Sequence, residues 1–243
     1  MFTESGSKVR GVFLRFTPAQ WVASGNLFGI ISLCSCTTSV QVGNGGGGGN
    51  PNLSATGLDA GTVLTLTPPT GAPVSMPLQQ SGIYFGNLNG VSSGIYQASN
   101  GTGGKDIAAF SVSFNGPPAF AWDSSKVNSI VRSQGYKVTW AGGDANSYVD
   151  ISGYAGGNGV TINGQFIPSN VGAAFECQVP AAAGSFTIPA SILLAMPAIT
   201  GGGTNGSLNV SLSTYPQTVT YPGTDFGFGS TGTAQISAQV AYQ

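Results

Sequence analysis

The residues that could do acid–base or metal chemistry gather in one short stretch. Asp144, Asn146 and Asp150 supply the hard oxygen atoms that Ca²⁺ binds in sets of about six to eight. Asp144 and Asp150 would also form the carboxylate pair of a glycoside hydrolase if they faced each other at about 5 to 9 Å. The stretch lacks the glutamate that ends an EF-hand loop. We therefore expect these side chains to cap a turn between two strands, with a calcium site at Asp144, Asn146 and Asp150 as the alternative.

Other groups that could support catalysis are scarce. The chain of 243 residues contains no His and three Cys, and both a cysteine nucleophile and a zinc site usually depend on His. The glycines at 45–49 are not followed by the Lys-Ser or Lys-Thr of a phosphate-binding loop. Only seven Lys or Arg residues are present, too few and too scattered for a nucleic-acid surface. The sequence predicts a protein that is not an enzyme, uses no cofactor and binds no nucleic acid.

Aromatic side chains offer a binding chemistry instead. Tyr148 and Tyr154 lie close to expected turns, and exposed aromatic groups on a β-scaffold mark binding surfaces. Trp140 alternates with Val138 and Tyr136 and is therefore expected in the core. Tyr148 and Tyr154 are the candidate residues for binding an extracellular polysaccharide or protein.

The N-terminal segment has the pattern of an export signal. Lys8, Arg10 and Arg15 precede an apolar run at 27–34, as in a secretory leader. The run is too short to span a bilayer as a helix of about 20 residues. We expect residues 1–36 to direct the chain out of the cytoplasm, into the cell envelope or the medium.

The end of this segment, Leu33-Cys34-Ser35-Cys36, resembles the lipobox of bacterial lipoproteins. The resemblance implies that Cys36 is the lipidated first residue of the mature chain and that the lipid binds a membrane. Cleavage of a plain secretory signal nearby is the alternative. Cys177 would then be left without a cysteine partner, as a buried side chain sharing a strand face with Phe175 and Val179.

The rest of the sequence predicts a linker followed by strands. Residues 37–57 include the glycine run and are typical of a flexible linker. Beyond them, apolar residues alternate with Ser, Thr, Asn and Gln, which is the pattern of strands with one buried face. The run 160–162, Asn163-Gly164, 165–167 predicts a two-residue hairpin. The single helix expected lies between Pro189 and Pro197.

These patterns predict an all-β fold, an antiparallel β-sandwich built from two packed immunoglobulin-like units. The break at 115–118 divides a small unit, 58–118, from a larger one, 119–243. Because about 60 residues is marginal for an independent core, one larger sandwich remains the alternative.

Several stretches resemble a group of uncharacterised, secreted soil-bacterial all-β proteins. They are the segments 58–66, 135–144, 175–177 and 184–193. The resemblance covers most of residues 58–243 and implies an exported fold without a catalytic residue. We expect a surface-tethered or secreted, non-catalytic β-sandwich with a structural or adhesive role. A carbohydrate-binding module that uses the loop aromatics is the alternative function.

Overall fold

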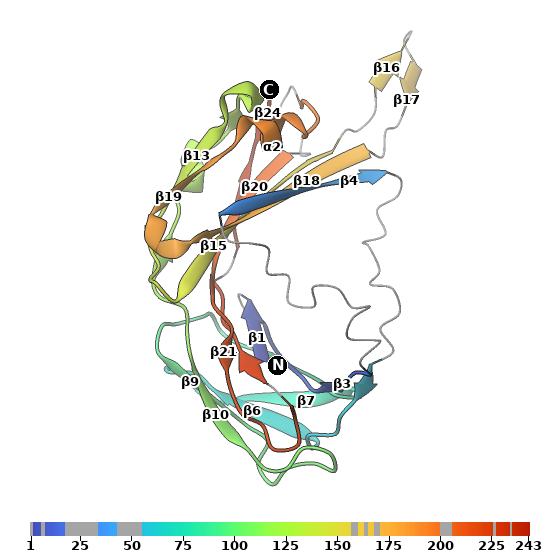
Figure 1. The fold of residues 1–243 in the computed structure, drawn as a ribbon, viewed down its shortest axis with the longest axis vertical. Helices are drawn as coiled ribbons and strands as arrows, with labels where there is room; N and C mark the ends of the chain where they lie inside the picture. The colour runs from blue at the N-terminus through green and yellow to red at the C-terminus, as the bar shows by residue number, and fades with distance from the viewer. Residues whose placement is uncertain are drawn as a thin grey trace. The chain divides into compact units, whose positions relative to one another are not determined.

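The computed structural model describes residues 2–5, 8–17, 34–42, 55–156, 160–162, 165–167, 171–199, 206–225, 227–233 and 235–243. Nearly all of these residues lie in strands or in the turns that join them, and the predicted all-β, antiparallel fold class is confirmed (Figure 1). The chain forms two compact units. Unit 1 takes its residues from Met1–Phe28, Asn50–Ala119 and Leu212–Ala234, and unit 2 from Gly29–Gly49, Phe120–Ser211 and Gln235–Gln243.

Unit 1 is built on a nine-stranded sheet. All neighbouring strands are antiparallel except β1 and β22. Their spatial order is β10 (Ser111–Asn115), β9 (Ile95–Ser99), β6 (Val63–Thr67), β7 (Val74–Gln80), β8 (Ile83–Asn87), β2 (Lys8–Val12), β1 (Phe2–Ser5), β22 (Phe228–Gly229), β21 (Gln217–Thr218). A separate pair joins β3 (Leu14–Arg15) to β5 (Thr56–Gly57).

The core of unit 1 is rich in aromatic rings. Phe13 lies between Tyr84, Phe110 and Tyr221, with ring centroids 6.0, 5.7 and 5.6 Å away. The buried amide of Asn100 supports the loops around this cluster. Its Nδ2 donates to the carbonyl oxygens of Ala60 and Ala108, at 3.1 and 3.0 Å, and its Oδ1 accepts from the backbone N–H of Phe110 at 2.7 Å.

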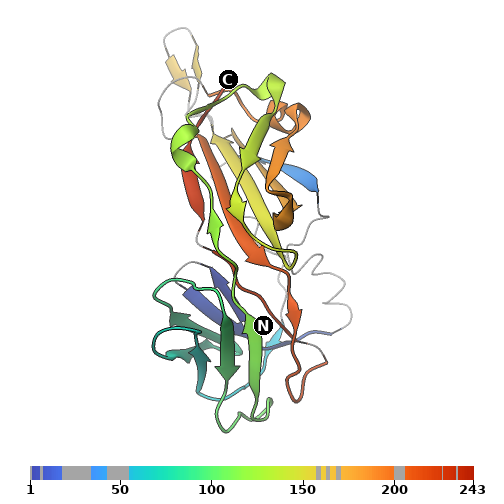
Figure 2. The same ribbon diagram turned by 90° about the vertical axis from the view of Figure 1, so that its left-hand side faces the viewer.

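Unit 2 is built on a five-stranded sheet (Figure 2). Its strands run in the order β23 (Ile236–Gln239), β20 (Gly206–Thr214), β15 (Ser147–Gly156), β18 (Val171–Pro180), β4 (Ser35–Val42). Shorter pairs complete the unit: β11 (Phe120–Ala121) with β14 (Ala141–Gly142), β12 (Ser129–Ile130) with β24 (Ala241–Tyr242), β13 (Tyr136–Thr139) with β19 (Ser185–Ile188), and β16 (Val160–Ile162) with β17 (Gln165–Ile167).

Helical structure in the described residues is brief. It consists of the turns η1 (Ser124–Lys126), η2 (Arg132–Gln134) and η3 (Ala181–Ala183) and the helix α2 (Ala190–Leu194). The helix lies where it was predicted, with Pro189 at its N-cap. The predicted hairpin is also confirmed, because Val160 pairs with Ile167 and Ile162 with Gln165.

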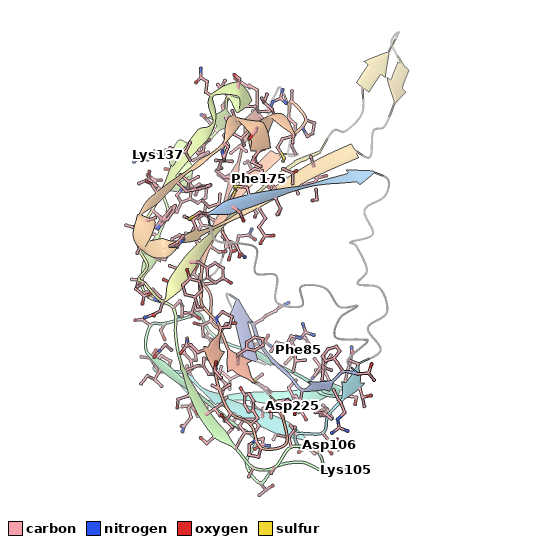
Figure 3. The ribbon with its side chains drawn as sticks, in the orientation of Figure 1. Phe85, Lys105, Asp106, Lys137, Phe175 and Asp225 are labelled. Atoms are coloured by element: carbon pink, nitrogen blue, oxygen red, sulfur yellow. A yellow bond between two sulfur atoms is a disulfide. The ribbon has the colours of Figure 1, made fainter. Side chains whose placement is uncertain are left out.

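The inner face of the five-stranded sheet supplies the core of unit 2. Val149, Ile151, Phe175, Val179 and Val210 are all buried, and Figure 3 labels Phe175 on β18. Trp140 is buried as predicted, and its indole N–H donates to the carbonyl oxygen of Ala181 at 2.8 Å.

Part of the predicted export segment is folded into unit 1 in the structure. Residues 8–12 form β2, which pairs with β8 in the middle of unit 1, and Val9 and Phe13 are core side chains. Basic residues alternating with apolar ones, as in Lys8-Val9-Arg10, suit a strand with one solvated face as well as they suit a leader. The apolar residues 27–33 lie outside the described residues.

Cys36 also differs from its predicted role. Its sulfur is bonded to that of Cys177, with Cα atoms 4.1 Å apart, and a sulfur in a disulfide is not available for a thioether to lipid. Cys177 is buried as predicted but has a partner, and the exposed Cys34 is the free cysteine. Residues 35–42 form β4, so the predicted linker begins within a strand. The glycines at 45–49 lie outside the described residues.

The predicted division of the chain agrees with the structure at one boundary and differs at the other. The change of unit after Ala119 lies next to the predicted break at 118. The residues from 119 to 243 are not one unit, however, because Leu212–Ala234 belong to unit 1. There β21 and β22 extend the nine-stranded sheet.

Candidate functional site: the open face of the five-stranded sheet

The outer face of the five-stranded sheet carries the polar side chains of unit 2. Along β15, buried residues alternate with Tyr148, Asp150, Ser152 and Tyr154, which are half-buried or exposed. Successive side chains of a strand point to opposite faces, so these four share one face. The predicted candidates Tyr148 and Tyr154 are therefore on the same side of the same strand. We call this outer surface, over β20, β15, β18 and β4, the open face.

The strand register sets the neighbours of these residues on the open face. Ser152 lies opposite Glu176 on β18, and Glu176 lies opposite Thr37 on β4. Tyr154 lies opposite Ala174, which in turn faces Ser39. The strands that carry this face contain no Lys or Arg. The open face is thus made of hydroxyl, amide and carboxylate groups around a tyrosine ring.

Tyr154 lies along the sheet over a pair of glycines. Gly156 and Gly172 are cross-strand partners next to Tyr154 on the open face. A Cβ added to Gly172 would come within 2.6 Å of the Tyr154 hydroxyl oxygen and 2.8 Å of Cε2, and one added to Gly156 would lie 2.8 Å from Cζ and 2.9 Å from Cε1. The ring therefore occupies the space that two side chains would otherwise fill. Its side chain remains 41% exposed.

A depression of about 260 Å³ adjoins the ring of Tyr154. Its polar lining comes from three strands in addition to that of Tyr154: Thr37 and Ser39 on β4, Glu176 on β18, Asn209 on β20. Hydroxyl groups both donate and accept hydrogen bonds, and an amide offers two donors and an acceptor. The depression can therefore hold a ligand that carries several hydroxyl groups.

Glu176 gives this depression a carboxyl group with altered acidity. Although the side chain is exposed, the sheet around its carboxyl removes part of its hydration and raises its pKa above the ordinary value. Burial disfavours the charged form of a carboxyl group. Sequence reasoning missed Glu176 as a site residue. Its place one residue before Cys177, which was expected in the core, already puts it on the outer face.

Of the predicted calcium ligands, Asp144 and Asn146 lie in the turn before β15, and Asp150 lies on β15 itself. Oδ1 of Asp144 accepts from the backbone N–H of Asn146 at 2.9 Å and from the Ser147 hydroxyl at 2.8 Å, so Asp144 caps its own turn, as expected. Asp150 lies further along β15, opposite Gln178. Within the described part of the chain, no group of three or more His, Cys, Asp or Glu side chains could share a metal ion.

A second and larger depression, of about 540 Å³, lies between two loops of unit 1. The loops join β6 to β7 and β8 to β9, and they contribute Pro68, Pro73, Leu88 and Asn89 to its lining. The lining contains neither an aromatic nor a charged side chain. It therefore lacks the aromatic ring and the carboxyl group that line the depression on the open face of unit 2.

Comparisons with known proteins do not assign the chain to a family. No protein-family model matches it, and no curated protein matches it. Among solved structures, it is similar to a DUF3823 family protein from Bacteroides ovatus, with 13% identity and a TM-score of 0.19, over 86% of this chain and all of that one. A DUF4785 family protein from Legionella pneumophila shows 16% identity and a TM-score of 0.17, over 65% of this chain and 44% of that one. Among the described residues, no helix is long and apolar enough to cross a membrane.

Proposed function

We propose that this protein is an extracytoplasmic, non-catalytic adhesive module that binds a neutral carbohydrate on the open face. The observation that carries the proposal is the position of Tyr154 over Gly156 and Gly172. With one side of the ring against the strands, the other side is a flat surface beside hydroxyl, amide and carboxylate groups. A sugar ring presents C–H groups on one side and hydroxyls at its rim, which matches that arrangement.

The physical reason for stacking is the charge distribution of the aromatic ring. The face of the tyrosine ring is slightly negative and its edge slightly positive, so polarised C–H groups are attracted to the face. The hydroxyl and amide groups of Thr37, Ser39 and Asn209 would then exchange hydrogen bonds with the rim of the sugar. Because the strands of this face carry no Lys or Arg, we propose a neutral rather than an anionic carbohydrate.

The proposed location outside the cytoplasm is supported by the Cys36–Cys177 disulfide. Disulfides form and persist in oxidising compartments and are rare in the cytosol of most organisms.

Binding to a panel of neutral polysaccharides, including glucans, mannans, galactans and xylans, tests this function. We expect the full-length, oxidised protein to be retained by at least one of them. Tyr154→Ala should weaken the binding about tenfold, because an aromatic contact of about 1.4 kcal/mol corresponds to that factor. Tyr154→Phe keeps the ring and should bind nearly as the wild type does.

Phe85→Ala is the matched control. Phe85 on β8 of unit 1 is 40% exposed, almost as much as Tyr154, but lies outside the open face (Figure 3). It should leave polysaccharide binding unchanged. If no neutral polysaccharide is retained, or if Tyr154→Ala binds as tightly as the wild type, the proposed function is wrong.

A further inference from the structure

Cys34, the cysteine that is not part of the disulfide, lies close in the sequence to the disulfide-bonded Cys36. Cys34 is exposed and carries a free thiol, and it precedes Cys36 by two residues. Its backbone N–H donates to the carbonyl oxygen of Gln178, the residue after Cys177, at 2.7 Å. The backbone of Cys34 is therefore already attached to the strand that holds the disulfide.

The spacing of the cysteines matches the repeat of a strand. In β4, Cys36 pairs with Cys177, Thr38 with Phe175 and Val40 with Ala173. A strand that slips by one residue turns every side chain to the wrong face, whereas a slip by two residues restores the original faces. After a two-residue slip of β4, Cys34 would lie opposite Cys177 and Cys36 opposite Phe175.

The position of β4 in the sheet permits such a slip. β4 is an edge strand whose one neighbour is β18, so a slip exchanges one set of ladder hydrogen bonds for another set. The strand has the sequence Ser-Cys-Thr-Thr-Ser-Val-Gln-Val. Displacing it by two residues again puts Ser35, Thr37 and Ser39 on the open face.

We propose that Cys34 is the nucleophile of an intramolecular thiol–disulfide exchange that moves β4 between two registers. The Cys34 thiolate attacks the sulfur of Cys177, the Cys34–Cys177 bond forms, and the Cys36–Cys177 bond breaks. Cys36 leaves as a thiolate and takes up the proton that Cys34 has lost. One disulfide and one thiol are present before and after the step, so neither an oxidant nor a reductant is consumed.

The exchange alters the open face as well as the covalent link. In the register of the structure, Glu176 lies opposite Thr37 and Ala174 opposite Ser39. In the slipped register, Glu176 would face Ser35, and Ser39 would move beside Gly172, which lies under the ring of Tyr154. Exchange would thus change which hydroxyl groups line the depression, independently of whether the ligand is a carbohydrate.

Trapping the free thiol with N-ethylmaleimide tests the exchange directly. The wild-type protein is incubated at about pH 5, where thiol–disulfide exchange is slow, or at about pH 8.5, where exchange is faster because the thiolate is the attacking species. It is then alkylated and fragmented in a mass spectrometer. We expect the label on Cys34 at low pH and a growing fraction on Cys36 at high pH. A label confined to Cys34 at both pH values, or found on Cys177, would overturn the proposal.

Two variants, each with one cysteine replaced by serine, test whether the second register can be reached. Cys36→Ser should form the Cys34–Cys177 disulfide under mild oxidation and leave no thiol to label. Cys34→Ser is the matched control, which keeps the disulfide of the structure and should also show no label at either pH. Two labelled thiols in Cys36→Ser, with far-UV circular dichroism like that of the wild type, would contradict the slip.

Discussion

The two units differ in the groups that surround their exposed aromatic rings. In unit 1, Phe13, Tyr84, Phe110 and Tyr221 form one buried cluster, and the exposed ring of Phe85 lies beside Arg10. In unit 2, Tyr148 and Tyr154 are on the outer face, and the inner face is joined to its edge strand by the Cys36–Cys177 disulfide. Both units therefore bury aromatic rings, but the exposed ring of unit 2, Tyr154, adjoins a depression lined by hydroxyl, amide and carboxylate groups.

Two tyrosines, one from each unit, illustrate this difference. The hydroxyl of Tyr84 donates to the carbonyl oxygen of Gly61 at 2.8 Å and accepts from the N–H of Ala60 at 3.0 Å, and burial raises its pKa. The Tyr84 hydroxyl therefore donates one hydrogen bond and accepts another, and both hold the loop that contains Ala60 and Gly61. Tyr154, in contrast, covers two glycines and remains 41% exposed. The Tyr84 ring thus belongs to the core of unit 1, whereas the Tyr154 ring presents part of its surface to solvent.

Removing the central ring of unit 1 should have the largest effect on stability. Phe13→Ala leaves a cavity between Tyr84, Phe110 and Tyr221, and we expect a loss of about 3–5 kcal/mol in the free energy of unfolding. Urea denaturation measures the loss, and hydrogen exchange read by mass spectrometry assigns it to a unit. Peptides from β6 and β9 should lose protection first.

Phe85→Ala is the control for the Phe13 variant, because it removes the same side chain from the surface of the same unit. Phe85 lies 5.5 Å from the guanidinium carbon of Arg10, and its loss should cost at most about 1 kcal/mol. Equal effects of the two substitutions would mean that residues 8–17 do not belong to the folded unit. That result would favour the prediction that these residues are an export segment.

Breaking the disulfide should have the next largest effect, and should affect unit 2. The bond joins residues 141 positions apart, and its loss in Cys177→Ser should cost about 2–4 kcal/mol. Reduction of the wild-type protein should lower the urea midpoint by a similar amount, whereas Cys34→Ser should not change it. If exchange protection of β15 and β18 stays unchanged after reduction, the edge strand does not contribute to the stability of unit 2.

The elements of the fold that follow from local patterns could be predicted from the sequence. Alternation located the strands around Val138 and Val210, Asn163-Gly164 located the hairpin, and Pro189 located the helix. Each depends on neighbouring residues whose period or turn chemistry has one main interpretation. The same local alternation put Trp140 in the core.

Features that depend on distant residues could not be predicted in this way. Cys36 and Cys177 are far apart in the sequence, and nothing near either residue identifies the other as its partner. The basic and apolar residues at 8–17 suited two interpretations, a leader and a strand, and the partner of such a strand, β8, lies about 75 residues further along the chain. The glycines under Tyr154 are also brought together by strand pairing, since Gly156 and Gly172 belong to different strands.

Glu176→Gln should have the smallest effect on the free energy of unfolding. The sign of its pH dependence distinguishes a partly dehydrated carboxyl group on the open face from a hydrated one on the ordinary surface. Because the pKa of Glu176 is raised in the folded protein, the folded chain holds this proton more tightly than the unfolded chain, whose glutamate pKa is about 4.3. The free energy of unfolding should therefore fall as the pH rises from the unfolded to the folded pKa. Glu176→Gln should remove that fall and be slightly more stable than the wild type at neutral pH.

Asp123 provides a control of opposite sign in the same titration. Hydrogen bonds from Ser125 and Lys126 lower the pKa of Asp123 to about 2, so its ionisation favours the folded state at neutral pH. That contribution should disappear as the pH falls below about 4 toward the folded pKa, and Asp123→Asn should remove it. Urea midpoints measured from pH 2 to pH 8 for the three proteins check both signs. A Glu176→Gln profile parallel to that of the wild type would mean that the carboxyl group is as well hydrated as one on the ordinary surface, and the depression beside Tyr154 would then be open to water.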